Sequence, residues 1–322
     1  MPEHVSVMLK EAMDMLNIQS HAWYIDATFG RGGHTSAILE RGANVIAFDH
    51  DLEAIQYGQQ AFANEIGAGR LILINTNFAD LGNSPELISK TILGILFDFG
   101  LNSVQLDTPR RGFSFQEDGP LDMRMDMRLG VTARDLVNAL GKKELYQLLT
   151  TFAQEYRARD IVDAILRARI SKPIETTQEL AQIVERAIGR REIAHGHARG
   201  NRKSSHLHPA TKTFMALRLA VNDELGSIER ALPTALDTVA DGGRIVTISF
   251  HEGEDRLVKH AMRAWHESGR GEALTKKPME PTEQEVRTNP RSRSAKMRTF
   301  QKGLSIKNTI DDETTNERAT SV

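Results

Sequence analysis

The stretch that decides the fold is YIDATFGRGGH, from Tyr24 to His34. An apolar run ending in an acidic residue is followed by Gly30, Gly32 and Gly33, and a helical pattern begins at Thr35. This order predicts a strand, a glycine turn and a helix. Glycine adopts positive φ without strain and lets a ligand approach the backbone amides at a helix start, where the partial charge is positive. The stretch therefore indicates either a nucleotide-type site or the structural turn of an ordinary βαβ unit.

Further strand-like runs follow, separated by helical patterns. The second strand, Asn44 to Phe48, is followed by Asp49. Dinucleotide-type folds place an acid that binds the ribose hydroxyls at about this position, after the second strand. A third runs from Leu71 to Ile74, and a fourth, Ile92 to Phe97, ends at Asp98. Strands that alternate with helices and end in acids predict a parallel, doubly wound α/β sheet with a ligand crevice along the carboxyl ends of its strands.

The composition indicates a soluble, globular protein. The chain has 322 residues, of which 40% are hydrophobic and 26% charged, and no apolar run approaches the about 20 residues that a membrane helix needs. Cysteine is absent, which excludes disulfides, thiolate metal sites and cysteine nucleophiles. The N-terminal residues MPEHVSVMLKEAMDML contain acids and no basic leader, so we expect a cytoplasmic protein that does not associate with membranes.

A long segment separates the fourth strand from the next convincing one, Arg244 to Phe250. Structureless loops longer than about 15 residues are uncommon, and this segment shows helical periodicity, so we predict an all-helical insertion. A helix that begins near Pro209 is expected to return the chain to the sheet domain. The predicted division is a discontinuous sheet domain (1–106 and 209–310), a helical substrate-recognition insertion (107–208) and a disordered tail (311–322).

Three stretches together resemble the bacterial ribosomal RNA small-subunit methyltransferase H family. They are HVSVMLKEA with YIDATFGRGGHT, RRGFSFQEDGPLDMRMD at 110–126, and HPATKTFMALRLAVNDEL with GGRIVTISFH. The resemblance implies a class I S-adenosylmethionine-dependent methyltransferase, a Rossmann-like doubly wound sheet with an inserted helical domain. It also implies the reaction, methylation of the N4 amine of a specific cytidine in small-subunit (16S) ribosomal RNA, which tunes the decoding centre.

The chain departs from the family pattern in two places. At residues 97–103 it has FDFGLNS where the family commonly has LDLGVSS, which keeps the acid and the glycine, so we expect activity to survive. At residues 249–256 it has SFHEGEDR where the family has SFHSLEDR, which leaves the roles of residues 252 and 253 open.

The resemblance also implies the contacts to S-adenosylmethionine, the expected cofactor. The glycines would admit its methionine end, and Asp49 would accept hydrogen bonds from both ribose hydroxyls. Phe78 would pack on adenine, and Asp98 would lie beside the methyl group. The full set is Gly32, Gly33, His34, Asp49, Phe78, Asp98 and Gln105.

No metal is expected. Methyl transfer from a sulfonium needs neither a metal nor a covalent enzyme intermediate, because the leaving group is already activated. Four histidines, His195, His197, His206 and His208, suggest a metal site, but no acidic or cysteine ligands accompany them.

Asp98 is the candidate catalytic residue. The lone pair of a cytidine N4 amine is delocalised into the ring, so an acceptor that holds its hydrogens helps the nitrogen attack, and a carboxylate can then take the proton. The alternative is a strand-end carboxylate that only caps the next turn. Phe113 and Phe115 either stack an extruded base or anchor the hinge of the insertion. Arg124 belongs either to an active-site wall or to an internally paired turn.

Two basic runs predict RNA contacts in a chain whose net charge is −2. Residues 186–212 hold seven basic residues and one acid, and residues 287–307 hold seven basic residues and no acid. Either run alone fits a solvated loop, whereas together they fit phosphate contacts on both sides of the crevice. Within the first run, Arg199, Arg202 and Lys203 are the candidate substrate-binding residues.

The expected partner is small-subunit ribosomal RNA, within the assembled small subunit, and a homodimer is possible. The alternatives are a non-catalytic RNA-binding ribosome-assembly factor and a class I methyltransferase with another acceptor. A dehydrogenase that shares the glycine turn is disfavoured, because GxGxxG requires glycine where the chain has Thr35.

Overall fold

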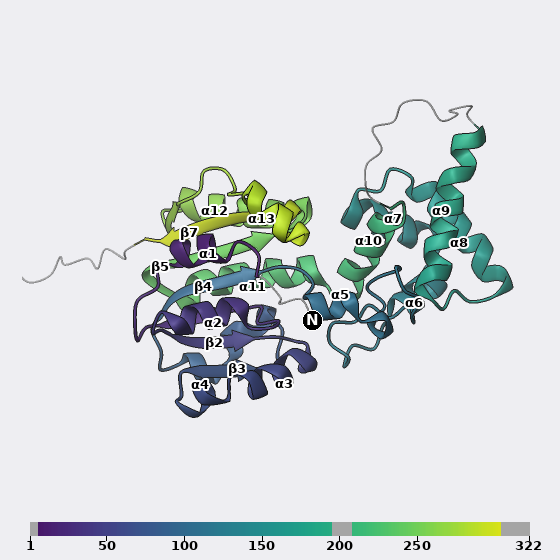
Figure 1. Ribbon diagram of the computed structural model, residues 1–322. Helices are drawn as coiled ribbons and strands as arrows, with labels where there is room; N and C mark the ends of the chain where they lie inside the picture. The colour runs from purple at the N-terminus through teal and green to yellow at the C-terminus, as the bar shows by residue number, and fades with distance from the viewer. Residues whose placement is uncertain (1–5, 195–207, 304–322) are drawn as a thin grey trace, which may run out of the picture.

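A seven-stranded sheet forms one lobe of the molecule, and Figure 1 shows it beside a second lobe built of helices. The computed structural model describes residues 6–194 and 208–303. The strands lie in the order β3-β2-β1-β4-β5-β7-β6. Their bounds are β1 Trp23–Asp26, β2 Asn44–Phe48, β3 Leu71–Ile74, β4 Ile92–Asp98, β5 Val239–Ser249, β6 Gly271–Ala273 and β7 Lys296–Lys302.

Strands β1 to β5 pair in parallel, which confirms the predicted doubly wound sheet. The sheet is mixed at one edge, because β7 runs antiparallel to β5 and β6 runs antiparallel to β7. Strand β6 was not predicted, because its three residues, GEA, carry no apolar alternation.

Helices cover both faces of the sheet. In β2, Val45 and Ala47 face a core shared with α1 and α2, whereas Ile46 and Phe48 face a core shared with α11 and α12. Successive side chains of a strand point to opposite faces, so a strand covered on both sides reads as a continuous apolar run. The helices of this lobe are α1 Leu9–Leu16, α2 Gly33–Glu40, α3 Leu52–Ala61, α4 Ala63–Gly67, α11 Glu224–Thr238, α12 Glu252–Glu267 and α13 Glu283–Thr288, with the short 3₁₀ turns η1 Phe78–Asn83, η2 Pro85–Leu87 and η4 Pro290–Ser294. Helix α5 Ser103–Asp107 and the 3₁₀ turn η3 Pro109–Arg111 follow β4 and lead into the second lobe, against whose core Leu106 packs.

The second lobe has a hydrophobic core of its own, which includes Leu149, Ile161 and Leu180. It is formed by α6 Ala133–Ala139, α7 Lys142–Ala153, α8 Ala158–Ser171, α9 Thr177–Ala194 and α10 Thr211–Val221. None of the helices that the structure describes has the length and apolar character needed to cross a membrane.

Helix α10 belongs to the helical lobe by its packing. It lies against α7 and α6, and Phe214, Leu217 and Val221 are part of the helical core. The expectation that this helix returns the chain to the sheet is therefore corrected: the chain returns with α11, whose Ile228 and Leu232 pack on the sheet. The domain division remains a prediction, but this packing favours an insertion that extends past residue 209 to the end of α10. The predicted tail, residues 311–322, lies outside the described residues.

Asn222, at the end of α10, holds part of the stretch RRGFSFQEDGPLDMRMD, residues 110–126, in place. Its Oδ1 accepts a hydrogen bond from the Met125 amide at 2.7 Å, and its Nδ2 donates to the Met123 carbonyl at 2.8 Å. Side-chain amides that pair with buried backbone groups in both directions substitute for a strand partner. Asn222 thereby fixes the position of residues 123–125 relative to the helical lobe.

We expect Asn222→Ala to lower the free energy of unfolding by about 2–3 kcal/mol, because it leaves buried backbone groups without partners. Urea denaturation measures this change. Asn64→Ala, at an exposed position on α4, is the matched control and should change stability by less than about 0.5 kcal/mol. Equal stabilities of the two variants would contradict the assignment.

Candidate active site

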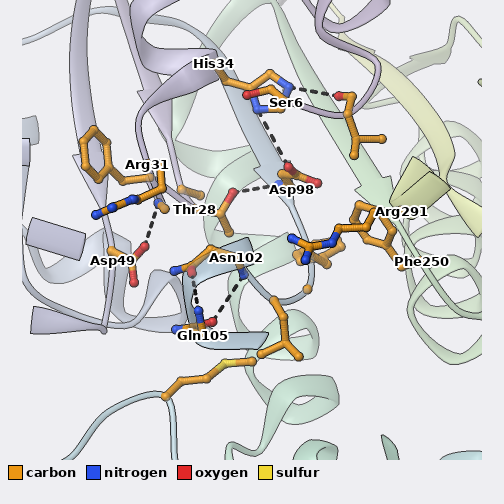
Figure 2. A pocket seen from close by; sticks show the side chains of 18 of the residues that line it. Ser6, Thr28, Arg31, His34, Asp49, Asp98, Asn102, Gln105, Phe250 and Arg291 are labelled. Carbon is orange, nitrogen blue, oxygen red and sulfur yellow. Dashed lines mark hydrogen bonds and ion pairs between the residues drawn. The ribbon is translucent and has the colours of Figure 1, made fainter. Parts of the chain in front are cut away.

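A cavity of about 430 Å³ opens at the carboxyl ends of β1, β2 and β4. The strand ends and the loops that follow them line it with Gly30, Asp49 and Asp98, and the helical lobe contributes Met125 and Asn222. Figure 2 shows Asp49 and Asp98 in this cavity. Its volume lies within the range of about 300–1,000 Å³ typical of small-molecule sites. Open α/β sheets bind ligands at this edge, so the cavity is the candidate active site.

Six of the seven predicted cofactor contacts line this cavity: Gly33, His34, Asp49, Phe78, Asp98 and Gln105. Gly32 does not, and packing explains its identity. Its φ is 75°, and an added Cβ would lie 2.6 Å from the Phe62 ring. At Gly33 an added Cβ would lie 2.0 Å from the Ser6 hydroxyl. Both glycines therefore allow close packing of the turn, and only Gly33 also faces the cavity.

The carboxylate of Asp49 is held in place by two backbone amides. Its Oδ2 accepts from the Gly30 amide and its Oδ1 from the Asp51 amide, each at 2.8 Å. A carboxylate has about four lone-pair positions, so two such bonds leave acceptor capacity for a ligand. Burial raises the pKa of Asp49. The glycine turn thus uses one of its amides to orient an acceptor at the cavity wall.

Asp98 carries the most unusual carboxylate of the site. Its Oδ1 is buried and has no hydrogen-bond partner among the described residues, while its Oδ2 lies 3.8 Å from Nδ1 of His34. His34 is itself fixed, because its Nε2 lies 3.2 Å from the Val7 carbonyl and can only donate to it. Figure 2 shows Asp98 between His34 and Thr28, whose hydroxyl accepts from the Asp98 amide.

Burial raises the pKa of Asp98 well above its usual range, and the negative charges of Asp26 and Glu254 raise it further. A buried carboxylate oxygen without a partner is rare in folded proteins and calls for an explanation. Strongly shifted carboxyl groups in clefts are typical of functional sites. Asp98 is therefore placed to accept a hydrogen bond, and then a proton, from a bound ligand.

Phe78 forms part of an aromatic wall. Its ring packs edge-on against Phe97, with centroids 5.7 Å apart, and lies 5.8 Å from the ring of Phe99. Phe78, Phe99 and Phe250 all line the cavity. The wall gives a flat ligand an apolar surface to pack on.

A buried ion pair that the sequence reasoning missed connects the site to the helical lobe. The Oδ2 of Asp51 accepts from Nη2 of Arg111 at 3.0 Å and from Nε2 of Gln105 at 2.7 Å. Arg111 also donates to the carbonyls of Arg124 and Met125, at 3.2 and 2.9 Å. The amide of Gln105 is thus engaged with Asp51 although the residue lines the cavity. The available signals were an acid at the start of a helix and an arginine within the RRGFSF stretch.

The two candidate base-stacking rings lie in the core of the insertion. Phe113 is buried there, and Phe115 packs on Phe214, with ring centroids 4.8 Å apart, and on His208, at 4.6 Å. Neither residue lines the cavity. This arrangement favours the alternative in which both rings anchor the hinge. The aromatic side chain that Figure 2 shows in the cavity, beside Arg291, is Phe250.

Arg124 is paired within its own turn. Its guanidinium forms two 2.8 Å hydrogen bonds to the Asp122 carboxylate and also donates to the carbonyls of Met127 and Leu129. It does not line the cavity. The turn explains Arg124 without a substrate, and Met125 is the member of this stretch that faces the site.

The predicted residues of the first basic run, Arg199, Arg202 and Lys203, lie outside the described residues, as do His195, His197 and His206. The ring of His208 is engaged with Phe115 and with the Ala210 amide. Within residues 6–194 and 208–303 no three histidine, aspartate or glutamate side chains are grouped to hold a metal ion.

Asp26 ties the end of β1 to the start of α2. Its Oδ2 accepts from the Thr35 hydroxyl at 2.7 Å and its Oδ1 from the Thr28 amide at 3.2 Å. Thr35 stands where a dinucleotide fingerprint requires glycine, and its hydroxyl explains why threonine is used here. Burial raises the pKa of Asp26 to about 6.

The pKa of Asp26 predicts how stability depends on pH. The folded state binds the proton more tightly than an unfolded aspartate, so this stabilisation is fully present below about pH 4 and is lost as the pH rises through about 6. We expect the unfolding free energy of the wild type, relative to Asp26→Asn, to fall by about 3 kcal/mol from pH 4 to pH 7. Urea denaturation across this range measures it. Asp14→Asn, at an exposed position on α1, should give a flat difference, and a flat difference for Asp26→Asn as well would refute the shift.

Comparison with known proteins identifies the family. Residues 1–303 match the model of the MraW methylase family. The ribosomal RNA small subunit methyltransferase H of Acidobacterium capsulatum is 44% identical over 308 residues, which cover 93% of this chain and 98% of that protein. The protein of the same name from Pelobacter propionicus is 41% identical over 320 residues, covering 93% of this chain and 98% of the relative.

Solved structures resemble the chain more distantly. A putative rRNA methylase from Clostridium thermocellum is 11% identical, with a TM-score of 0.42 over 93% of this chain and 100% of that one. The family assignment rests on the sequence matches, which span nearly the whole chain and confirm the resemblance inferred from its motifs. The chain belongs to the MraW methylase family.

Proposed function

We propose that this protein transfers a methyl group from S-adenosylmethionine to the N4 amine of a cytidine in small-subunit ribosomal RNA. The observation that carries the proposal is the Asp98 carboxyl group, which lines the cavity and whose buried Oδ1 has no hydrogen-bond partner in the described part of the chain. The names of the relatives supply the class of RNA. An exocyclic amine is a donor that such an oxygen can bind.

The charges of the cavity fit the methyl donor of this family, S-adenosylmethionine, which is a sulfonium cation. Five carboxylates line the cavity, and two of them, Asp49 and Asp98, lie beside the glycine turn. Buried negative charge favours a cationic ligand because the local dielectric is low. Asp49 would accept hydrogen bonds from the ribose hydroxyls, and the adenine would pack on the aromatic wall that includes Phe78.

The bound cofactor would supply a methyl group that is already activated for transfer, so the protein's residues act on the acceptor. The carboxylate of Asp98 accepts a hydrogen bond from the amine, which favours the pyramidal geometry in which the nitrogen lone pair is not delocalised into the ring. His34 and Thr28 hold the carboxyl group and its backbone in position. The raised pKa of Asp98 suits it to take the proton as the new bond forms.

The helical lobe completes the site for RNA. Met125 and Asn222 close the cavity on that side, so a base that enters must leave its stack. Arg199, Arg202 and Lys203 remain our candidates for phosphate contacts. The assembled small subunit as substrate, a homodimer and a cytoplasmic location likewise remain predictions.

Direct assay tests the function. Purified protein is incubated with S-adenosylmethionine and small subunits from a strain that lacks the gene, and the ribosomal RNA is analysed by nucleoside mass spectrometry. We expect N4-methylcytidine. A methyl group on another nucleoside would overturn the acceptor, and no transfer to RNA in any form would overturn the enzymatic assignment.

Asp49→Ala should weaken S-adenosylmethionine binding by about 1.5–3 kcal/mol, because a charged acceptor of ribose hydroxyls is lost. Isothermal titration calorimetry measures the affinity, and a melting curve monitors folding. Asp80→Ala, which removes an exposed carboxylate from η1, is the control and should bind as the wild type does. Unchanged affinity in Asp49→Ala with a normal melting curve would remove Asp49 from the site.

Asp98→Asn should lose turnover far more than cofactor affinity, because the amide keeps the shape of the carboxylate but cannot take the proton. In the wild type, activity should fall as the pH drops through the raised pKa of Asp98, since the protonated acid cannot accept a second proton. Asp98→Asn should lack this dependence. A turnover within about threefold of wild type at saturating substrates, about 0.65 kcal/mol in the barrier, would rule out the catalytic role.

A further inference from the structure

Two residues of the second basic run, Arg298 and Lys302, are used within the fold. Arg298 forms a two-pronged ion pair with Asp255, at 2.7 and 3.0 Å, and its side chain is only 9% exposed. Lys302 donates to the Val239 carbonyl at 2.7 Å. Neither group is available to an external phosphate, so fewer positive charges of this run can bind RNA than the sequence alone suggests.

Arg291 is the member of this run, among the described residues, that lines the cavity. Figure 2 shows its side chain beside Phe250, on the opposite side of the cavity from Arg31 and Asp49. Its Nη2 donates to both carboxylate oxygens of Asp107, at 2.8 and 3.0 Å. The two side chains are 44% and 64% exposed, and exposed pairs of this kind contribute little to stability. An anion from outside can therefore replace Asp107 at low cost.

The backbone that carries Arg291 is well anchored. Glu285, one helix earlier, accepts a hydrogen bond from the Met8 amide at 2.7 Å. Ser292, the next residue along the chain, is fully buried, and its hydroxyl donates to the Asn289 carbonyl. The segment thus presents the guanidinium at a fixed place on the cavity rim, while the pairing of the guanidinium itself remains exchangeable.

The charge of the cavity makes a cation at the rim necessary for a nucleotide. The lining holds five carboxylates, Asp49, Asp98, Asp107, Glu224 and Glu254, which would repel the phosphates flanking a base. Arg31 and Arg291 are the arginines among the described lining residues, and the Arg31 guanidinium stacks on the Tyr57 ring, 3.8 Å from its centroid. A guanidinium that donates to a carboxylate in this way also suits a phosphate, another anion with several acceptor oxygens.

We propose that Arg291 binds a backbone phosphate of the target nucleotide, and that Asp107 occupies the guanidinium in the RNA-free protein as an internal competitor. The inference rests on the proposed function, since it takes RNA as the substrate. If Asp107 competes with the phosphate, removal of the Arg291 side chain weakens RNA binding and removal of the Asp107 charge strengthens it. An ion pair that served only the fold would give both partners the same effect.

The test is the dissociation constant for small subunits that lack the modification, measured at several salt concentrations. Arg291→Ala should weaken binding about tenfold and reduce the log–log salt slope by about 1, with cofactor affinity unchanged. Asp107→Asn should tighten binding about two- to threefold. Arg270→Ala is the matched control: Arg270 pairs with an exposed acid, Asp237, and the two side chains are 43% and 66% exposed, but it lies outside both basic runs and does not line the cavity.

The double variant Asp107→Asn/Arg291→Ala separates direct contact from repulsion by a released Asp107. It should bind about as weakly as Arg291→Ala, that is, without recovery, whereas recovery to wild-type affinity would overturn the contact. Arg291→Lys, which keeps the charge and loses the planar guanidinium, should retain the salt slope. Equal weakening by Arg291→Ala and Asp107→Asn, or an Arg291→Ala affinity equal to that of Arg270→Ala, would also overturn the proposal.

Methylation of the same subunits by the wild type is measured in parallel. Wild-type methylation together with unchanged RNA affinity in Arg291→Ala overturns the role of Arg291 alone. A wild type that neither binds nor methylates the subunits overturns the proposed function and this inference with it.

Discussion

The buried ion pair between Asp51 and Arg111 is the interaction on which the arrangement of the site depends. Both side chains are at most 5% exposed, and removal of either partner would leave the other charge buried at a cost of about 3–5 kcal/mol. Asp51 belongs to the loop after β2, whereas Arg111 reaches the carbonyl of Met125. The pair therefore fixes the distance between the sheet edge and the wall of the helical lobe.

The same pair orders the ligand-binding side of the cavity. The Asp51 amide donates to Asp49, and the Asp51 carboxylate accepts from Gln105, which forms a capping box with Asn102 at the start of α5. The loops after β2 and β4 are thus linked by side chains rather than by a strand ladder. These hydrogen bonds help a cavity built from such loops to keep its shape, since their loss would leave buried polar groups without partners.

Much of the fold was predictable because apolar periodicity marks elements that bury a face. The strands β1 to β4, the helical insertion and the acids at the strand ends all follow from that pattern. The pattern does not show which other element a helix packs against, since α10 is amphipathic whichever lobe it covers. Strand β6 is too short to show a period. The pairing of a charge is equally invisible, which is why the basic run at residues 287–307 did not distinguish the buried Arg298 from the exposed Arg291.

The interior of the site and its rim favour ligand groups of different charge. Inside, Asp49 and Asp98 favour a cation and tolerate a neutral base, but the low dielectric makes any anion there costly. At the rim, water screens the carboxylates, and an exposed guanidinium can change partners. A nucleotide satisfies both environments at once, because its base is neutral and its phosphates lie several bonds away. This separation of charge lets one cavity receive a cationic methyl donor and a segment of a polyanion without either repelling the other.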